Sequence, residues 1–432
     1  MKGGGRAGTR DRGLRDLKTV FAALGQPDQQ MPPVVHIAGT NGKGSTVTLL
    51  KAMAEAHGLR VHTHTSPHMV DVSERICIAG QPIEHDYAHS LLDRLDKAEE
   101  RCGAVLGFPH RLMAVACMAF AEHPADICLI ETGMGGRLDP TNTLSAKAAT
   151  IITAIGHDHM HILGDHVVEI AAEKAGIMRD GTPVIIARQP HDEAYKALSR
   201  IAARIGAPVR DASPVIMDTG WGIPDLVANL PPLPSPSLIG PHQIANAAGA
   251  LAALSLVSPV DLKTDAVIHG LTHAFWPGRL HQIASGPLLE KLPEGSELWV
   301  DGAHNRDGSE ALAAALPALL DGRPLQIITS MGENKDPQDL LGPLAPLTAK
   351  LVALDFPHFK TMLPAAAIVQ GCAELEIPAV EPAPSLNAAC RLLDNCPSLV
   401  LVTGSLYLIG EILADHVPAK PDTTPAQPDT AL

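Results

Sequence analysis

Two repeating patterns of apolar and polar residues run along most of this chain. Short runs of apolar, often β-branched residues predict buried strands, whereas apolar residues that recur every three or four positions predict amphipathic helices. In the first part of the chain, strands are predicted at 34–38, within 59–68, and at 127–131, 149–153 and 183–187. Helices are predicted at 13–24, 47–57, 86–102, 113–121, 167–176 and 192–205, and from about 240 to 256.

Strands that alternate with helices in this way predict a parallel sheet covered by helices on both faces. In such sheets, ligands bind at the carboxyl ends of the strands. Polar clusters follow four of the predicted strands, near Gly42, Ser66, Glu131 and His159. We therefore expect a binding site at this edge of the sheet.

A second alternating series predicts another sheet in the last third of the chain, with strands at 298–301, 325–329, 351–355 and 399–402. Polar residues again follow the strands, among them Asp301, His304 and Asn305 after the first and Lys335 after the second. The expected class is α/β.

Composition shifts suggest where the two sheets separate. The proline-rich segment 223–241 predicts an irregular connection, and 286–295 predicts a linker. The end of the chain is rich in proline and polar residues and predicts a disordered tail. The expected division is a first domain at 1–285, a smaller second domain at 286–415 and a tail at 416–432.

Bulk composition narrows the class of partner. The chain has 432 residues, of which 46% are hydrophobic and 19% charged, and its net charge is −14. No basic tract offsets that charge, so no nucleic-acid partner is expected. Anionic substrates remain compatible, since they need only a locally positive site and a metal ion.

Cysteine usage and the absence of long apolar runs indicate the compartment. The seven cysteines are scattered and form no C-x-x-C pair, which is typical of a reducing environment. The first 15 residues lack the apolar core of a signal peptide, and no apolar run is long enough to span a bilayer. We expect a cytoplasmic protein without a membrane partner.

The run from Gly39 to Thr46 follows a predicted strand and precedes a predicted helix. Glycines let backbone N–H groups gather around an anion, and the helix N-terminus adds partial positive charge. Lys43 can reach terminal phosphates, and Ser45 or Thr46 can hold Mg²⁺. The strict GxxxxGK[ST] pattern is not met, because Gly44 separates the lysine from the hydroxyls. The alternatives are a nucleotide-binding loop and a glycine-rich turn that binds nothing.

Other polar residues at strand ends and turns have two interpretations each. Glu131 could bind Mg²⁺ or pair with Arg137. His159 could bind a metal, carry a proton, or be one of 21 ordinary histidines. Lys174 lies near the predicted end of a helix, where lysine commonly interacts with the helix dipole. Arg279 could clamp phosphate or occupy a surface turn.

Ten segments together resemble the folylpolyglutamate synthase/dihydrofolate synthase family of the Mur ligase superfamily. They occur in the family's order between about residues 13 and 414: HIAGTNGKGST (36–46), TSPHMVDVSERI (65–76), IETGMGGRLDPTN (130–142), HDHMHILGD (157–165), EKAGI (173–177), GPHQIANA (240–247), PGRL (277–280), DGAHN (301–305), MGENKD (331–336) and TGSLYLIGE (403–411). The resemblance implies a Mur-ligase-type P-loop ATPase domain with a mainly parallel sheet, followed by a smaller Rossmann-like α/β domain.

The resemblance also implies roles for individual residues. ATP and its phosphates would be contacted by Thr40, Asn41, Gly42, Lys43, Gly44, Ser45, Thr46, Asn246, Arg279, Asp301 and His304. Metal would be held by Ser45, Ser66, Glu131 and His159. Lys174 matches a lysine that can be carbamylated in this family and would then help to hold a second Mg²⁺. Lys43, Lys174, Arg279 and His304 are the expected catalytic residues.

One segment departs from the family pattern. Ahead of Ala119 and Phe120 the family usually carries a Thr-aromatic-Phe-Glu run, whereas this chain has His110-Arg111-Leu112-Met113. Met113 replaces the expected glutamate, and no site residue is assigned there.

The implied reaction is ATP-dependent ligation. ATP phosphorylates a carboxylate, and the amine of L-glutamate then displaces phosphate to give an amide, ADP and phosphate. The expected acceptors are dihydropteroate and tetrahydrofolate or its polyglutamates, used by a bifunctional monomer. One alternative is a Mur-type ligase with another acceptor. Peptidoglycan ligases of that type carry an additional N-terminal UDP-sugar domain, for which the 33 residues before Val34 are too few. The other alternative is a non-catalytic, nucleotide-gated binding protein.

Overall fold

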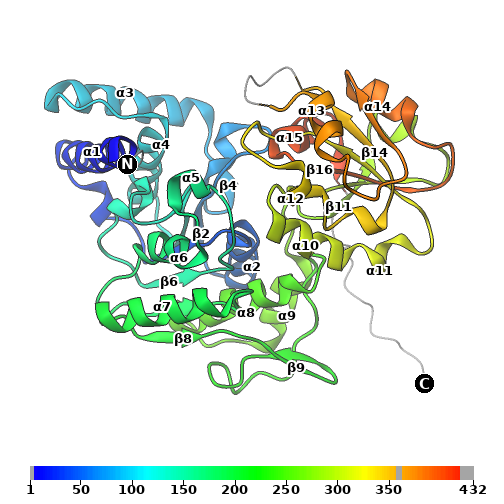
Figure 1. The fold of residues 1–432 in the computed structure, drawn as a ribbon. Helices are drawn as coiled ribbons and strands as arrows, with labels where there is room; N and C mark the ends of the chain where they lie inside the picture. The colour runs from blue at the N-terminus through cyan, green and yellow to red at the C-terminus, as the bar shows by residue number, and fades with distance from the viewer. Residues whose placement is uncertain (1–3, 357–361, 419–432) are drawn as a thin grey trace.

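A computed structural model describes residues 4–356 and 362–418 and contains two large sheets. In Figure 1 the blue-to-green part of the chain and the yellow-to-red part form two lobes that meet along one boundary. We call the eight-stranded sheet with helices α1–α9 the first lobe, and the seven-stranded sheet with helices α10–α15 the second lobe.

The first lobe is built on a mainly parallel sheet with the order β4-β3-β2-β5-β1-β6-β7-β8. Only β3 and β4 run antiparallel to their neighbours within it. Its strands are β1 (Val34–Ala38), β2 (Val61–His64), β3 (Ile76–Ile78), β4 (Gln81–Pro82), β5 (Ile127–Glu131), β6 (Ala149–Ile152), β7 (Val184–Ile186) and β8 (Val209–Asp211). Because β1, β5 and β6 are buried on both faces, they consist largely of apolar residues, as the sequence pattern indicates.

Helices cover both faces of this sheet. They are α1 (Gly4–Ala23), α2 (Lys43–Ala56), α3 (His85–Cys102), α4 (Phe108–Glu122), α5 (Met160–Leu163), α6 (Val167–Ala175), α7 (Asp192–Ile205), α8 (His242–Val257) and α9 (Thr264–His273). Val35 and Ile37 of β1 pack in one core with α2, α8 and α9. Val34 packs on the other face with α1, α3 and α4, and Ala38 with α6 and α7. Alternate side chains of β1 therefore pack against the helices on opposite faces of the sheet.

The second lobe repeats the layered plan on a smaller scale. Its sheet has the order β15-β14-β13-β16-β12-β11-β17, parallel from β15 to β12 and antiparallel at β11 and β17. The strands are β11 (His281–Ser285), β12 (Glu297–Val300), β13 (Leu325–Thr329), β14 (Thr348–Leu354), β15 (Val380–Ala383), β16 (Leu399–Thr403) and β17 (Val417–Pro418). The helices are α10 (Arg306–Ala315), α11 (Pro317–Leu320), α12 (Pro337–Leu341), α13 (Ala365–Gly371), α14 (Leu386–Leu392) and α15 (Leu406–Asp415).

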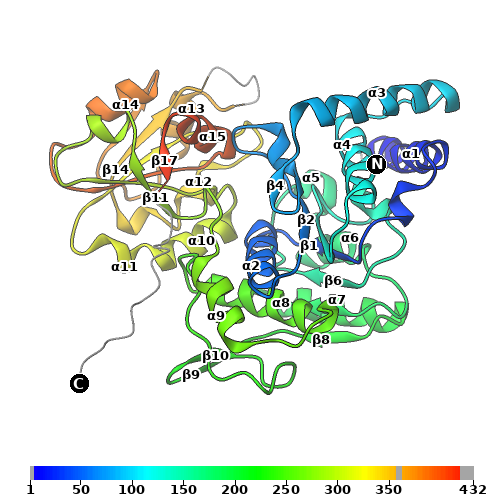
Figure 2. The ribbon, with the colours of Figure 1, turned by 180° about the vertical axis from the view of Figure 1, so that it is seen from behind.

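Short elements complete the architecture. The antiparallel hairpin β9 (Val215–Met217) and β10 (Gly220–Gly222) precedes the proline-rich connection, which is irregular as predicted. The 3-10 helices are η1 (Pro27–Gln29), η2 (Val72–Arg75), η3 (Pro140–Thr143), η4 (Leu289–Lys291) and η5 (Ala345–Leu347). Figure 2 shows from behind that β17 lies beside β11 at the edge of the second sheet. None of the helices in residues 4–356 and 362–418 is long and apolar enough to cross a membrane.

The α/β class and the principal elements agree with the sequence predictions. Strands β5 and β13 and helix α7 have the predicted bounds, whereas α1 begins nine residues before the predicted helix at 13–24. Strands β8, β11 and β15 and helix α9 were not predicted. The start of the predicted tail forms β17, and residues 419–432 lie outside the described part of the chain.

Candidate active site

A cavity of about 620 Å³ lies between the lobes, at the carboxyl ends of the central strands of the first sheet. It brings together residues from distant parts of the sequence, such as Thr40 and His304, which are 264 positions apart. The predicted site residues that line it are Thr40, Asn41, Gly42, Lys43, Gly44, Ser45, Ser66, Glu131, His159, Lys174, Asn246, Arg279, Asp301 and His304. Thr46 is fully buried and is absent from the lining.

The glycine loop joins β1 to α2 and places a glycine at the N-cap of this helix. Gly42 adopts a φ of 85° at the N-cap of α2, a left-handed conformation that favours glycine. A Cβ at this position would lie 2.2 Å from Oδ1 of Asn246, which comes from α8. The N-terminus of α2 therefore meets the cavity without an obstructing side chain at its cap.

Lysine side chains are held against this loop. Lys43 donates from Nζ to the carbonyl oxygens of Gly39 and Thr40, both at 3.1 Å. Lys174, in the last turn of α6, donates from Nζ to the carbonyl of Gly39 at 2.7 Å. Burial, reinforced by the nearby charge of Lys43, lowers the pKa of Lys174 to about 7. Lys174 is therefore part of the cavity wall and not merely a dipole partner at a helix end.

Glu131 ends β5 as a carboxylate with only 3% of its surface exposed. Burial raises its pKa to about 6, although Lys43 and a 3.4 Å hydrogen bond from the backbone N–H of Ser66 oppose that change. Within residues 4–356 and 362–418 Glu131 forms no ion pair, and Arg137 pairs with Glu173 at 2.7 Å. The alternative that Glu131 pairs with Arg137 is therefore wrong.

The surroundings of Glu131 fit a hard divalent cation. A desolvated carboxylate that faces a cavity without a paired cation is costly unless a ligand neutralises it. Ser45, Ser66 and His159 line the same cavity. Carboxylate and hydroxyl oxygens match the preference of Mg²⁺ for oxygen ligands and water, whereas the imidazole of His159 is a less usual ligand.

His159 occupies a left-handed backbone position at the start of α5, with φ 50°. Burial lowers its pKa to about 4, although the charge of Asp158 opposes that change. Its imidazole is therefore neutral near pH 7 and carries a free lone pair, which a metal ligand needs.

The second lobe supplies Asp301 and His304, which follow β12, and Arg279 lies in the turn before β11. The Asp301 carboxylate accepts hydrogen bonds from the backbone N–H groups of Leu280 (2.8 Å) and Ala303 (2.7 Å). It thereby fixes the two turns that carry Arg279 and His304. Arg279 lines the cavity and is not confined to a surface turn.

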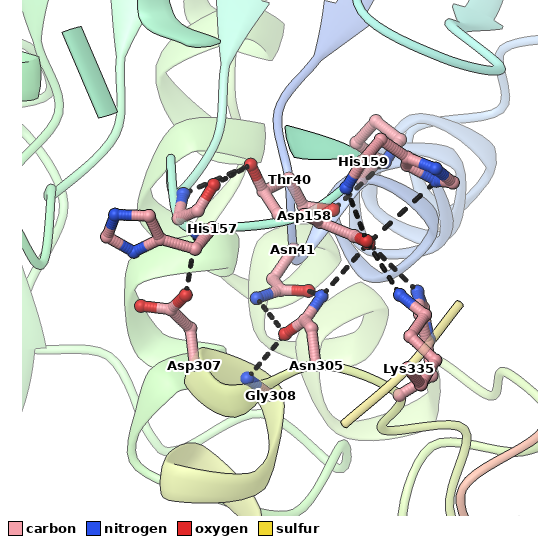
Figure 3. A network of polar contacts seen from close by, with 12 residues as sticks. Thr40, Asn41, His157, Asp158, His159, Asn305, Asp307, Gly308 and Lys335 are labelled. Carbon is pink, nitrogen blue, oxygen red and sulfur yellow. Dashed lines mark hydrogen bonds and ion pairs between the residues drawn. The ribbon is translucent and has the colours of Figure 1, made fainter. Parts of the chain in front are cut away.

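Asp158 contacts several side chains of the second lobe (Figure 3). The sequence pattern did not predict it as a site residue. Its carboxylate lies 2.7 Å from Nζ of Lys335 and 3.3 Å from Nε2 of His304, and it accepts a 3.3 Å hydrogen bond from Asn305. Burial opposes its ionisation, but the hydrogen bond and charge of His304, together with Lys335, outweigh burial and lower the pKa of Asp158. The carboxylate of Asp158 in the first lobe thus holds Lys335, His304 and Asn305 of the second lobe in place.

The glycine loop itself is tied to the second lobe. Asn41 and Asn305 exchange two amide hydrogen bonds, at 3.0 and 3.1 Å, and both are drawn in Figure 3. The hydroxyl of Thr40 donates to the carbonyl of Gly156 and accepts from its backbone N–H, both at 3.0 Å. Loop 39–46, the turn at 156–159 and the start of α10 therefore form one polar network.

We expect Asp158→Asn to lower kcat/KM of the expected ligation by about 10- to 100-fold and to reduce the thermal midpoint, because Lys335 loses its counter-charge and His304 loses its carboxylate partner. Asp165→Asn, at an exposed carboxylate seven residues further along the chain, should leave both quantities near wild type. Steady-state assays and thermal melts of the two variants check this expectation. Equal behaviour of Asp158→Asn and Asp165→Asn would contradict the role of Asp158 between the lobes.

The departure at 110–113 lies away from the cavity. Met113 is fully buried in the core formed with α1 and α3. None of the four departing residues is among those that line the cavity.

Comparisons with known proteins agree with this architecture. A family model described as the Mur ligase middle domain matches residues 37–211, and one described as the dihydrofolate synthetase C-terminal domain matches residues 290–415. A Bacillus subtilis protein named dihydrofolate synthase/folylpolyglutamate synthase is 31% identical over 431 residues, covering 93% of this chain and 94% of the relative.

Solved structures match the whole arrangement of lobes. Escherichia coli FolC in complex with ADP, without folate substrate, matches with a TM-score of 0.82 at 27% identity, over 93% of each chain. A bifunctional folylpolyglutamate synthase/dihydrofolate synthase with Mn, AMPPNP and L-glutamate bound matches with a TM-score of 0.80 at 26% identity, again over 93% of each chain.

Proposed function

The chain belongs to the dihydrofolate synthase/folylpolyglutamate synthase family, and from that premise we propose how its residues carry out ligation. It is an ATP-dependent acid–amino-acid ligase that adds L-glutamate to dihydropteroate and to reduced folates or their polyglutamates. The proposed mechanism rests on one observation. Lys43 and Lys174 of the first lobe line the same cavity as Arg279 and His304.

We propose that ATP binds with its phosphates over the N-terminus of α2. The backbone N–H groups of Gly42, Gly44 and Ser45 would donate hydrogen bonds to the phosphate oxygens, as at other helix N-termini. Asn246 lies against Gly42 and would contact the nucleotide from α8. The remaining nucleotide contacts are assigned to Thr40, Asn41, Arg279, Asp301 and His304, whereas Thr46 is buried away from the cavity and receives no direct contact.

The reaction has two steps in which atoms and charge balance. An oxygen of the acceptor carboxylate attacks the γ-phosphorus of ATP, ADP leaves, and an acyl phosphate forms. The amine of L-glutamate then attacks the acyl carbon and gives up one proton to solvent, and phosphate departs with the oxygen that joined carbon to phosphorus. Lys43, Arg279 and His304 would stabilise the charge that moves with the phosphoryl group. The protein positions the reactants and excludes water when the lobes meet.

We assign Ser45, Ser66, Glu131 and His159 to a divalent metal, with Mg²⁺ as the physiological ion. When bound, Mg²⁺ would neutralise phosphate oxygens and hold them in line for transfer. We assign a second ion to the neighbourhood of Lys174, after carbamylation of its amine.

Carbamylation of Lys174 gives a specific prediction. A lysine whose pKa is about 7 is partly neutral at physiological pH, so its amine can add to CO₂, lose a proton and become a carboxylate. With ¹³C-bicarbonate, the wild-type protein should show a carbamate ¹³C resonance that Lys174→Gln lacks, and that variant should lose about 10²-fold in activity.

The matched control is Lys147, a second buried lysine whose pKa burial lowers to about 6. Lys147 donates to Asn142 and to the carbonyl of Ile177, away from the cavity lining. The resonance should persist in Lys147→Gln. A signal that disappears in Lys147→Gln and remains in Lys174→Gln would contradict the assignment.

One assay tests the reaction and its acceptor. The purified protein is given ATP, Mg²⁺, L-glutamate and either dihydropteroate or tetrahydrofolate labelled with ¹⁸O in the reacting carboxylate. We expect a product heavier by one glutamyl residue, with one ¹⁸O in the released phosphate. Product formed without ¹⁸O in phosphate would exclude the acyl phosphate.

The same assay separates the two alternatives. A Mur-type ligase with another acceptor would bind ATP but form no pterin-containing amide. A nucleotide-gated binding protein would hydrolyse ATP equally slowly with and without acceptor and glutamate.

Other properties are proposed on separate grounds. We propose a cytoplasmic location, because all seven cysteines are free thiols. We also propose that the protein acts as a monomer, because both lobes of one chain contribute to the cavity. The division at residues 285 and 286 stays a prediction.

A further inference from the structure

A second group of potential metal ligands lies at the boundary of the lobes, outside the lining of the cavity. It consists of His157 after β6, His191 at the N-cap of α7, and Asp307 in the first turn of α10. One ligand atom from each lies within 4.8 Å of the other two. Residues 150 positions apart are brought together here, since the backbone N–H of His157 donates to Asp307 at 3.0 Å (Figure 3).

The donors are already partly arranged as a coordination sphere. Nε2 of His191 lies 3.1 Å from Oδ1 of Asp307, and the rings of His157 and His191 meet edge to face at 5.6 Å between centroids. Ligands around a tetrahedral Zn²⁺ with bonds of about 2.0–2.1 Å lie about 3.3 Å apart. The His191–Asp307 spacing already meets that requirement, and the imidazole of exposed His157 can rotate into reach.

The chemistry of these donors selects a class of ion. Two imidazoles and one carboxylate favour Zn²⁺, Co²⁺, Ni²⁺ or Cu²⁺ over Mg²⁺, which prefers oxygen ligands. The backbone N–H of His157 donates to Oδ2 of Asp307. This hydrogen bond orients the carboxylate so that its other oxygen, Oδ1, faces His191. A metal at Nε2 of His191 requires the ring proton to sit on Nδ1.

We propose that His157, His191 and Asp307 bind one divalent transition-metal ion of the zinc class, with water in the remaining positions. Both histidines belong to the first lobe and Asp307 belongs to the second. The bound ion therefore joins the lobes and stabilises the arrangement in which they meet. This site is separate from the one assigned to Mg²⁺ and does not depend on the proposed reaction.

The test uses Co²⁺ as a spectroscopic probe on the full chain, with millimolar Mg²⁺ present to occupy oxygen-rich sites. Wild-type protein should bind one Co²⁺ with visible d–d absorption, and Zn²⁺ should displace it and raise the thermal midpoint. His191→Ala and, independently, His157→Gln should weaken Co²⁺ binding by at least about tenfold and abolish the midpoint shift. Circular dichroism confirms that each variant is folded.

Two control variants distinguish this site from others. The rings of His269 and His273 stack on α9 at 4.1 Å between centroids and could chelate a metal by themselves. His269→Ala should keep wild-type Co²⁺ affinity, and so should Glu131→Gln, which alters the site assigned to Mg²⁺. The proposal is overturned if His191→Ala and His157→Gln retain wild-type affinity, or if His269→Ala or Glu131→Gln loses it instead.

Discussion

Replacing Lys43 by alanine should lower kcat/KM by at least about 10³-fold with either pterin acceptor. The lysine lies at the N-terminus of α2, over which the phosphates are expected, and its Nζ is already held at the loop by two carbonyl oxygens at 3.1 Å. Removing a positioned cation from a phosphoryl-transfer site costs about 4 kcal/mol of transition-state stabilisation. Steady-state kinetics with dihydropteroate and with tetrahydrofolate measure the loss.

The control for this experiment lies on the same helix. Lys51 pairs with Glu55 at 2.8 Å on a partly exposed face of α2 and does not line the cavity. Lys51→Ala should retain activity within about twofold, since such pairs contribute little. Near-native turnover of Lys43→Ala, in a protein whose fold is unchanged, would show that the glycine loop does not hold the reacting phosphate.

Replacing Glu131 by glutamine should have opposite effects on activity and stability. The amide keeps the size of the side chain and can still accept the hydrogen bond from Ser66, but it cannot neutralise a metal ion. We expect activity to fall by about 10³-fold and the Mg²⁺ concentration for half-maximal activity to rise. Glu100→Gln, at an exposed carboxylate on α3, should change neither quantity.

The stability effect follows from the raised pKa of Glu131, about 6 against an ordinary 4.5. The folded protein binds this proton more tightly than the unfolded chain, so stability falls by about 2 kcal/mol as pH rises through this interval. Glutamine has no such ionisation. Without metal, Glu131→Gln should therefore be about 1–2 kcal/mol more stable than wild type at pH 7.5, and the difference should vanish near pH 4.

Urea unfolding at the two pH values measures this difference. A variant that is less stable than wild type at pH 7.5 would indicate that the carboxylate already has a compensating partner. A variant that is more stable but fully active would remove Glu131 from the metal site.

Local sequence patterns were sufficient where an element is buried on both faces or amphipathic along its whole length. Strands β5 and β13 are short, mainly apolar runs that are buried at every position, and in α7 apolar residues recur every three or four positions, so their bounds could be predicted. Elements at or next to a sheet edge lack such signals. Strand β11 is only partly buried, and β15 contains Pro382, which argues against a strand unless it lies at an edge.

Helix α9 was missed because its fit depends on a partner that is distant in sequence. Gly270 faces the backbone of α2, where a Cβ would lie 2.4 Å from Cα of Met53. Glycine weakens the helical pattern but permits this close approach. The reason for a glycine at position 270 is therefore evident only from the packing of α9 on α2.

The candidate site divides in a similar way. Residues beside glycines at strand ends could be found from local pattern, and they line one cavity. Asp158 could not, because its role depends on Lys335, 177 residues away, and on His304. Both partners lie within segments that carry the family resemblance, so those segments were the available signal. Spacing alone does not indicate which of their side chains meet.

The network around Asp158 and Asn41 also has a thermodynamic consequence for the catalytic cycle. Separating these groups would hydrate ions and amides and expose little hydrocarbon at this point of the boundary. Release of ADP through this side should therefore carry a small change in heat capacity and should accelerate with ionic strength.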